Sequence, residues 1–331
     1  MNSTIRRAAA LAVAGALAVA VAGCSSEAEE APSAGSAEES AWPRTIEHEL
    51  GETTIDAQPA NIVSTSISIT GTLLAIDAPV TASAATTVSA ITDDQGFFSQ
   101  WSDVADERGL EVLYPDLELD LEAVIAADPD LIVISTSGAD TTADAYDQLS
   151  EIAPTIALDY GSQSWQELAV TLGEATGLED QVDAAIDGYD AEIAEAASEI
   201  EAPAGEANAI VYNGTENDTA FAKEGSPHAE LLDSLGFTIV AAPDDLDTSE
   251  QARNDFAFLS VENAVATLTA DTVLLISGGD DTLESLVNEP VFANAPAIQS
   301  GQVYPLGETS FRIDYYSALD IAQTLVSELG A

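Results

Sequence analysis

The sequence is poor in cysteine, histidine and basic residues, and each shortage removes a class of function. A single cysteine excludes an intrachain disulfide and a cysteine-based zinc site. Two histidines leave little scope for a metal held by imidazole. Seven Lys+Arg against 59 Asp+Glu give a formal charge of −52, so the chain cannot neutralise a run of phosphates. It is therefore not a general nucleic-acid-binding protein.

Motifs of catalysis are also missing. The sequence has no Gly-x-Ser-x-Gly, Gly-x-Gly-x-x-Gly, Walker or His-Glu-x-x-His pattern. His228 near Ser226 is the one pairing of a base with a nucleophile, but Ser226 and Pro227 are typical of the cap and first turn of a helix. We therefore do not expect an enzyme.

The amino terminus has the pattern of an export signal. Arg6 and Arg7 precede a small-apolar run, 8–22, that is too short for a permanent membrane span. The run ends in residues 21–24, Val-Ala-Gly-Cys, which resemble a bacterial lipobox. Cleavage before Cys24 and lipidation of its sulfur would anchor the protein to the outer, extracytoplasmic face of the bacterial cytoplasmic membrane. An ordinary signal peptide with an incidental cysteine is the alternative, and Sec and twin-arginine export both stay open.

The chain divides by composition and periodicity into five parts. After the signal peptide, 1–23, the stretch 24–42 is rich in Ser, Glu, Ala, Gly and Pro and predicts a flexible acidic tether. Apolar strands alternating with helices predict an N-terminal α/β lobe over 43–176 and a C-terminal α/β lobe over 204–331. The predicted strands are 61–66, one that starts at 78–80, 131–135, 208–212, 237–240 and 272–277. The predicted helices are 67–76, 121–125, 229–235 and 261–265.

One long helix is predicted between the lobes, within 177–203. Apolar residues recur at steps of three and four on one face, while Asp and Glu occupy the other. These apolar residues are Val182, Ile186, Tyr189, Ile193, Ala197 and Ile200. The fold class is thus α/β, with two lobes of parallel-type sheets joined by one long helix. Ligands of such sheets bind at the carboxyl ends of the strands, which predicts a ligand cleft between the lobes.

Four segments carry a family resemblance, in addition to the lipobox and the paired lobes. Residues 62–80, 94–101, 146–154 and 308–318 resemble the substrate-binding lipoproteins of iron-siderophore ABC importers, in particular those for ferric enterobactin. The similarity runs from about Ala60 to the end of the chain. It implies a ferric catecholate-type siderophore as ligand, with the iron held by the siderophore, so that no cofactor and no protein metal ligand is needed. Haem and cobalamin, ligands of the same class, are the alternative, with Tyr212, Tyr315 or Tyr316 as possible haem ligands.

The resemblance also implies the binding residues. A tris-catecholate is anionic and aromatic at its rim, and arginine both pairs with oxygens and stacks on rings. The expected ligand-binding residues are Arg312, Arg253, Trp101, Tyr316, Phe98 and Lys223. Arg108 is expected to be structural, and Ser99 stands where the family has a further basic residue.

Two glutamates occupy equivalent places in the two halves. Glu122 and Glu262 each open a short helix before a core strand. In the family, one glutamate on each lobe docks onto arginines of the dimeric ABC permease. We expect that role here, although each glutamate also suits a helix amino terminus by its charge alone. The binding protein itself is expected to be a monomer.

Overall fold

The computed structural model describes residues 42–249 and 253–330. The predicted signal peptide, Cys24 and nearly all of the predicted tether lie outside these residues. Within the part of the chain that is described, no helix is both long and apolar enough to cross a membrane.

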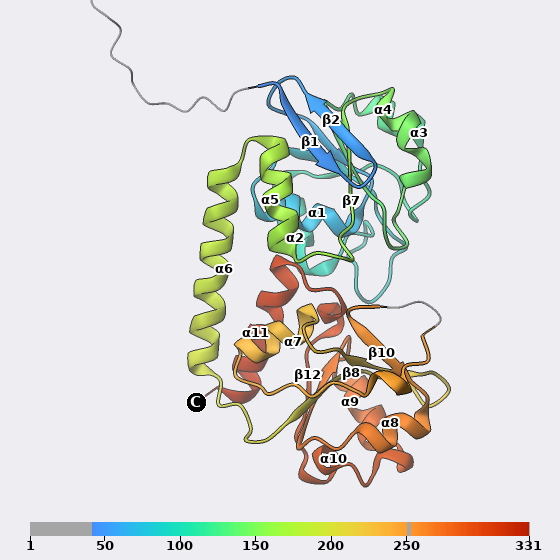
Figure 1. Ribbon diagram of the computed structural model, residues 1–331, viewed down its shortest axis with the longest axis vertical. Helices are drawn as coiled ribbons and strands as arrows, with labels where there is room; N and C mark the ends of the chain where they lie inside the picture. The colour runs from blue at the N-terminus through green and yellow to red at the C-terminus, as the bar shows by residue number, and fades with distance from the viewer. Residues whose placement is uncertain (1–41, 250–252, 331) are drawn as a thin grey trace, which may run out of the picture. The chain divides into compact units, whose positions relative to one another are not determined.

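The N-terminal lobe is built on a five-stranded parallel sheet (Figure 1). The strand order is β5-β4-β3-β6-β7. The strands are β3 (Ile62–Ser64), β4 (Val80–Ser83), β5 (Glu111–Val112), β6 (Leu131–Ser135) and β7 (Thr155–Leu158). A separate antiparallel hairpin joins β1 (Arg44–His48) to β2 (Gly51–Ile55). The helices are α1 (Ile67–Ala75), α2 (Ser99–Arg108), α3 (Leu121–Ala126), α4 (Tyr146–Ser150) and α5 (Trp165–Thr176), and the 3-10 turn η1 spans Ala143–Ala145.

The C-terminal lobe has a mixed sheet of five strands in the order β10-β9-β8-β11-β12. The strands are β8 (Ala207–Val211), β9 (Thr219–Ala222), β10 (Phe256–Leu259), β11 (Thr272–Ile276) and β12 (Val303–Pro305). The helices are α7 (Pro227–Ser234), α8 (Val261–Thr267), α9 (Asp280–Val287), α10 (Pro296–Ser300) and α11 (Tyr315–Leu329), with 3-10 turns η2 (Asp244–Leu246), η3 (Pro290–Phe292) and η4 (Glu308–Phe311). Strands β8, β11 and β12 are parallel, whereas β9 is antiparallel to both of its neighbours.

The predicted strand 237–240 is the main error in this lobe. It makes one isolated bridge, from Ile239 to Ala207 at the start of β8. The rest of that edge is taken by β9, which pairs with Ile210 and Val211 at the end of β8. A local apolar pattern cannot show that another strand already occupies the edge, because strand pairing depends on contacts distant in sequence.

Helix α6 (Glu179–Glu199) connects the lobes and is held by close packing on α5. Its residues Val182, Tyr189 and Ile193 are buried, as the apolar stripe predicts. A Cβ on Gly173 of α5 would lie 2.5 Å from the Val182 side chain, so glycine is what lets the two helices approach. The fold class predicted from sequence is confirmed: two α/β lobes with parallel-type sheets and one long joining helix.

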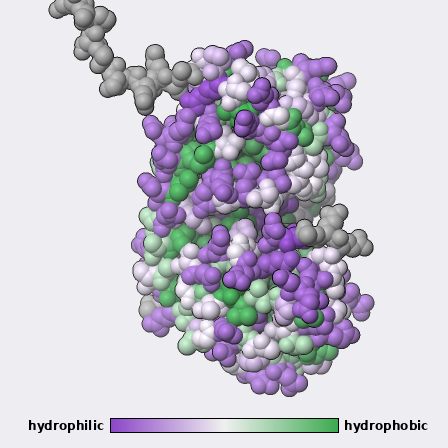
Figure 2. Space-filling view, viewed as in Figure 1, coloured by the Kyte–Doolittle hydropathy of each residue, from purple (hydrophilic) through white to green (hydrophobic). Residues whose placement is uncertain are grey.

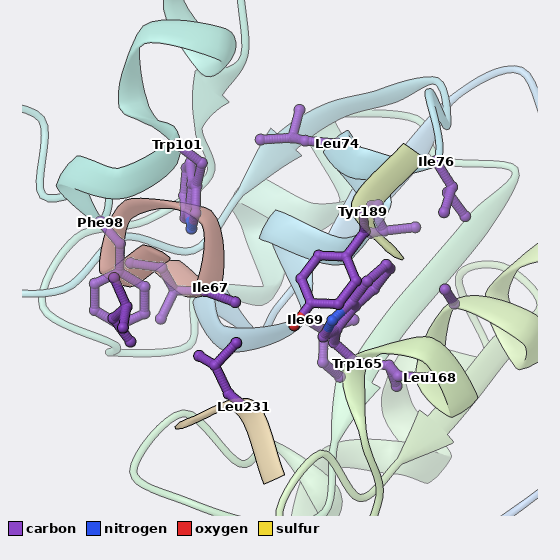
Figure 3. Close-up of a cluster of buried hydrophobic side chains, with 14 of the residues drawn as sticks. Ile67, Ile69, Leu74, Ile76, Phe98, Trp101, Trp165, Leu168, Tyr189 and Leu231 are labelled. Atoms are coloured by element: carbon purple, nitrogen blue, oxygen red, sulfur yellow. The ribbon is translucent and has the colours of Figure 1, made fainter. Parts of the chain in front are cut away.

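A second helix also crosses between the lobes. The C-terminal helix α11 packs on α6 and also on α1 and α2 of the N-terminal lobe. Its capping residue Asp314 accepts a hydrogen bond from Gln100 Nε2 of α2 at 3.1 Å, and burial raises the pKa of this carboxyl. One continuous hydrophobic core therefore includes residues of both lobes. Figure 3 draws part of it, with Ile67 of α1 and Leu231 of α7 among its side chains.

Candidate functional site

A cleft of about 2420 Å³ is lined by both lobes and by α6. On the N-terminal side it is lined by Phe98, by Gly138 beyond β6, and by Tyr160 beyond β7. On the C-terminal side it is lined by Lys223 beyond β9 and by Arg312 beyond η4. Gly138 and Tyr160 follow the carboxyl ends of parallel strands, which is where α/β sheets bind their ligands. A cleft of this size is large enough for a bulky solute.

Arg312 lies at the contact between the lobes. Its guanidinium carbon is 5.0 Å from the centre of the Tyr160 ring and 5.9 Å from that of Phe98. Both rings belong to the N-terminal lobe, whereas Arg312 follows η4 of the C-terminal lobe. Within residues 42–249 and 253–330, Arg312 is the one basic side chain with no carboxylate oxygen within 4.0 Å. Among the described residues, its guanidinium faces two rings and no carboxylate, so no described ion pair has to break before an anionic ligand binds.

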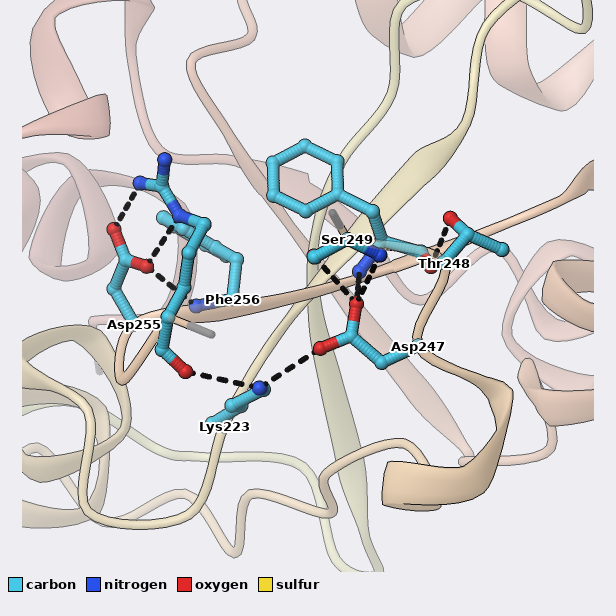
Figure 4. A network of polar contacts seen from close by, with 8 residues as sticks. Lys223, Asp247, Thr248, Ser249, Asp255 and Phe256 are labelled. Atoms are coloured by element: carbon cyan, nitrogen blue, oxygen red, sulfur yellow. Dashed lines mark hydrogen bonds and ion pairs between the residues drawn. The ribbon is translucent and has the colours of Figure 1, made fainter. Parts of the chain in front are cut away.

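Arg253 and Lys223 form a different kind of cationic site, because each already has a carboxylate partner (Figure 4). Arg253 donates to both carboxylate oxygens of Asp255, at 2.8 and 2.5 Å. Lys223 Nζ donates to Asp247 Oδ2 and to the backbone oxygen of Arg253, both at 2.9 Å.

The pKa values of Arg253 and Asp247 are shifted at this site. Asp255 raises the pKa of Arg253 by its hydrogen bonds and charge. Burial acts to raise the pKa of Asp247, but hydrogen bonds from Ser249 and Lys223 outweigh it and lower that pKa. A ligand would have to exchange with both carboxylates to reach these cations.

Phe98 reaches the cleft because the preceding turn fixes its position. Asp93 Oδ1 accepts hydrogen bonds from the backbone N–H groups of Gln95 and Phe97, at 2.9 and 2.8 Å. Gly96 has a φ of +86°, and a Cβ there would lie 2.1 Å from the Thr86 oxygen, so this turn requires glycine. Phe97 then points into the core, and Phe98 lines the cleft with 8% of its surface exposed.

Two of the predicted aromatic contacts are not brought to the cleft. Trp101 is 1% exposed and packs against Phe97 with ring centroids 5.4 Å apart, so its role in the structure is to fill the core behind Phe98. Tyr316 is half-buried against Tyr315, at 5.0 Å between centroids, and burial raises its pKa to about 12. Tyr212, Tyr315 and Tyr316, considered as haem ligands, are all absent from the cleft lining.

Sequence reasoning missed several residues of the cleft lining, of which Tyr160 and Phe311 lie closest to Arg312 in space or in sequence. Tyr160 comes two residues after β7, so the rule that strand ends face the ligand could have identified it. Phe311 is 38% exposed, and its ring stacks on Phe256 at 5.5 Å with an interplanar angle of 8°. Nothing in the sequence around Phe311 indicates that its side chain is exposed in the cleft next to Arg312.

His228 is buried beneath this aromatic stack and is unsuited to catalysis. Its Nε2–H donates to the Ser310 backbone oxygen at 2.9 Å, which assigns the proton to Nε2. Ser226 Oγ accepts from the Ala229 N–H as the cap of α7 instead of pairing with this imidazole. Burial lowers the His228 pKa to about 4, so the ring is neutral at pH 7.

We expect this buried imidazole to make stability depend on pH. The unfolded chain takes up a proton near pH 6.5 and the folded chain near pH 4, so stability falls as pH drops through that interval. The loss attributable to His228 between pH 7 and pH 5 is about 2 kcal/mol. Urea unfolding of the wild type and of His228→Gln at both pH values measures it. Parallel stability losses in the two proteins would contradict the prediction.

Glu122 and Glu262 are both exposed, each in the first turn of its helix, α3 or α8. Asp120 caps α3 and Ser260 caps α8, so neither glutamate is needed as a cap. In the described residues neither carboxylate forms an ion pair. Their equivalence in the two lobes is therefore unexplained by local structure.

Hydrophilic residues cover most of the face drawn in Figure 2.

Comparison with known proteins agrees with this architecture. The family model described as periplasmic binding protein matches residues 62–309. The chain is 43% identical to the ferric enterobactin-binding periplasmic protein FepB of Escherichia coli over 86% of this chain and 90% of that one. The crystal structure of holo-ViuP matches with a TM-score of 0.80 and 41% identity, over 88% of this chain and 96% of that one.

A more distant structure supports the fold alone. It is the periplasmic catecholate-siderophore binding protein VctP of Vibrio cholerae, with a TM-score of 0.59 and 19% identity, over 86% of this chain and 98% of that one. The match at 62–309 includes both sheets and the helix that joins them. The chain belongs to the periplasmic binding protein family, whose role is to bind a solute rather than to catalyse a reaction.

Proposed function

We propose that this chain is the substrate-binding protein of an ABC importer, and that it captures a ferric catecholate-type siderophore and delivers it to the permease. The observation that carries the proposal is Arg312, a cation with no described carboxylate partner, held against two aromatic rings in a cleft shared by the lobes. The 43% identity to a ferric enterobactin-binding protein supports this choice of ligand.

The chemistry of the cleft suits a ligand that brings its own iron. Ferric tris-catecholate carries a charge of about −3 on oxygens around an aromatic rim, which favours arginine donors and aromatic faces. In the described residues no group of three His, Cys, Asp or Glu is placed to hold a metal. Catecholate oxygens would therefore keep the iron, and the protein would bind the ligand's outer surface.

Hydroxyl groups in the cleft add neutral donors. Ser68 and Ser137 line it, and their Oγ atoms are buried with no hydrogen-bond partner in the described part of the chain. Buried polar groups are normally satisfied. We infer that ligand oxygens or water satisfy these two in the bound state.

Tryptophan fluorescence tests the ligand assignment. Trp165 lines the cleft, so a bound iron-catecholate should quench its emission. The purified full-length chain is titrated with ferric enterobactin, a ferric hydroxamate, haemin and cobalamin. Saturable, submicromolar quenching by the catecholate alone is the expected result. Tight binding of haemin, cobalamin or the hydroxamate alone would overturn the ligand while keeping the family.

Lys223 is expected to contribute less than Arg312 to the affinity for the ligand. Lys223→Met lowers affinity for ferric enterobactin by less than about tenfold, because the amine must leave Asp247 to meet the ligand. Isothermal titration at one fixed salt concentration measures the change. A loss of 100-fold would show that Lys223 is a principal contact. The stability of the variant is checked by thermal unfolding.

The remaining features of the transport role stay proposals. We infer that a lipid on Cys24 holds the protein at the outer face of the cytoplasmic membrane, that the binding protein is a monomer, and that Glu122 and Glu262 meet the permease. Metabolic labelling with a palmitate analogue, in wild type and Cys24→Ser, tests the anchor. Label that persists in the variant would place the lipid elsewhere.

A further inference from the structure

Tyr160 connects the predicted ligand-binding arginine to the rigid part of the opposite lobe. Arg312 comes from the C-terminal lobe, yet its nearest described ring is Tyr160, 5.0 Å away and just beyond β7 of the N-terminal lobe. An arginine side chain has many rotamers in water, and ordering it on binding lowers affinity. A ring face that already holds the guanidinium removes part of this cost.

The ring of Tyr160 is itself fixed by a buried carboxylate. Its hydroxyl donates to Asp140 Oδ1 at 2.8 Å. Asp140 is 4% exposed, and its other oxygen accepts from Ser66 Oγ at 2.6 Å and from the Ser68 N–H at 3.0 Å. These two donors are at the start of α1, so the carboxylate is held by a helix end as well as by a side chain.

Gly138 provides the space that this arrangement needs. It has a φ of +76°, and a Cβ there would lie 1.6 Å from the Tyr160 hydroxyl oxygen and 3.1 Å from Asp140 Oδ1. Any side chain at this position would push the phenol off its carboxylate partner. The three residues thus form one unit, in which Gly138 leaves room, Asp140 fixes the hydroxyl, and the ring supports Arg312.

We propose that Tyr160, fixed by Asp140 and accommodated by Gly138, is a positioning residue that holds the Arg312 guanidinium ready for the ligand. The proposal rests on the proposed function, because it takes the ferric catecholate as the ligand that Arg312 meets. On this proposal, Tyr160 raises the affinity for the ligand by holding Arg312 in place, and not by contacting the ligand itself.

A double-mutant cycle separates positioning from direct contact. Tyr160→Leu, Arg312→Ala and the double variant are titrated with ferric enterobactin. Tyr160→Leu should lower affinity about tenfold in the wild-type background and less than twofold in the Arg312→Ala background. Equal losses in both backgrounds would overturn the proposal, because Tyr160 would then act independently of Arg312.

Two further variants test how the ring is fixed. Tyr160→Phe keeps the ring but loses the bond to Asp140, and should lower affinity about threefold. Tyr146→Phe is its matched control, since that hydroxyl bonds to His48 and Thr53 in the same lobe but outside the cleft. No loss in Tyr160→Phe, or the same loss in Tyr146→Phe, would contradict the role of Asp140.

Gly138→Ala is compared with Gly109→Ala as its matched control. Gly109 also has a positive φ, +68°, but nothing lies within 4 Å of a Cβ built there. Gly138→Ala should therefore lower affinity several-fold more than Gly109→Ala, although both place alanine in the left-handed region. Equal effects would show that backbone strain alone, not the Tyr160 hydroxyl, limits position 138.

A measurement without ligand distinguishes failure of this proposal from failure of the proposed function. The sequence has only six arginines, so ¹⁵N-arginine spectra of the full chain are simple, and Arg312→Ala assigns the Arg312 Nε–H signal. Ring currents should shift this signal upfield in the wild type, and Tyr160→Leu should remove most of the shift. An unchanged signal in Tyr160→Leu would overturn the positioning role, whatever the wild type binds.

Discussion

We expect Arg312→Ala to lower the affinity for ferric enterobactin by about 100-fold. The variant removes from a sheltered cleft the one described cation that lacks a carboxylate partner, and leaves ligand oxygens without their donor. Truncating one member of a sheltered, hydrogen-bonded charge pair costs about 2–5 kcal/mol, and each 1.4 kcal/mol is tenfold in Kd. Fluorescence or calorimetric titration of wild type and variant under one salt condition measures the ratio.

Arg108→Ala is the matched control for this variant. It removes the same charge from the chain, but Arg108 lies outside the cleft lining and pairs with Asp77 at the end of α1. Its affinity should stay within about twofold of wild type, because distant exposed charges are screened within about 8 Å at physiological salt. A loss below threefold in Arg312→Ala, or equal losses in both variants, would mean that Arg312 is not a direct ligand contact.

Reversing both proposed docking charges, Glu122→Lys with Glu262→Lys, is expected to abolish uptake while ligand affinity stays unchanged. Each exposed ion pair contributes about 1 kcal/mol or less, and reversal replaces attraction by repulsion. Two reversed contacts together should weaken association with the permease by up to about 4 kcal/mol, or up to roughly a thousandfold. Uptake of ⁵⁵Fe-enterobactin by cells that carry the matching permease measures the effect, beside a ligand titration of the purified variant.

The control for docking is a double reversal at unrelated positions. Glu107→Lys with Glu195→Lys changes the net charge equally, and both residues are exposed, on α2 and α6. This variant should transport at nearly the wild-type rate. If it loses uptake to the same degree, the response follows total charge and not a contact on α3 and α8. If the Glu122 and Glu262 variant transports normally, these residues do not dock the permease.

Much of the fold could be predicted because its signals are local. The predicted strand 131–135 coincides with β6, and helix 67–76 differs from α1 by one residue. The stripe on α6 identified its buried face because helical spacing alone decides which side chains share a face. The antiparallel strand β9 could not be found this way, since its pairing with β8 depends on a competition with residues 237–240 for one sheet edge.

The residues of the candidate site also differ in how far the sequence could predict them. Arg312 was predicted from its charge and from the family resemblance, and the structure places it in the cleft lining, while its contact with ligand stays a prediction. Trp101 was predicted to contact ligand, yet Phe97, Trp101 and Ala105 are spaced by four residues and are all buried, a pattern that predicts a core face. Asp140 had no local signal, because its partners Ser66 and Tyr160 are brought to it by the sheet and not by sequence spacing.

The hydrophobic core that includes residues of both lobes has a consequence for how the molecule loses its structure. Packing of α11 on α1, α2 and α6 means that the largest part of the apolar interior is shared by the lobes, beside a smaller buried cluster within each lobe. We therefore expect the two lobes to unfold as one cooperative unit, in a single thermal transition. Cutting the chain within α6 would yield two fragments with exposed apolar surface, not two smaller working proteins.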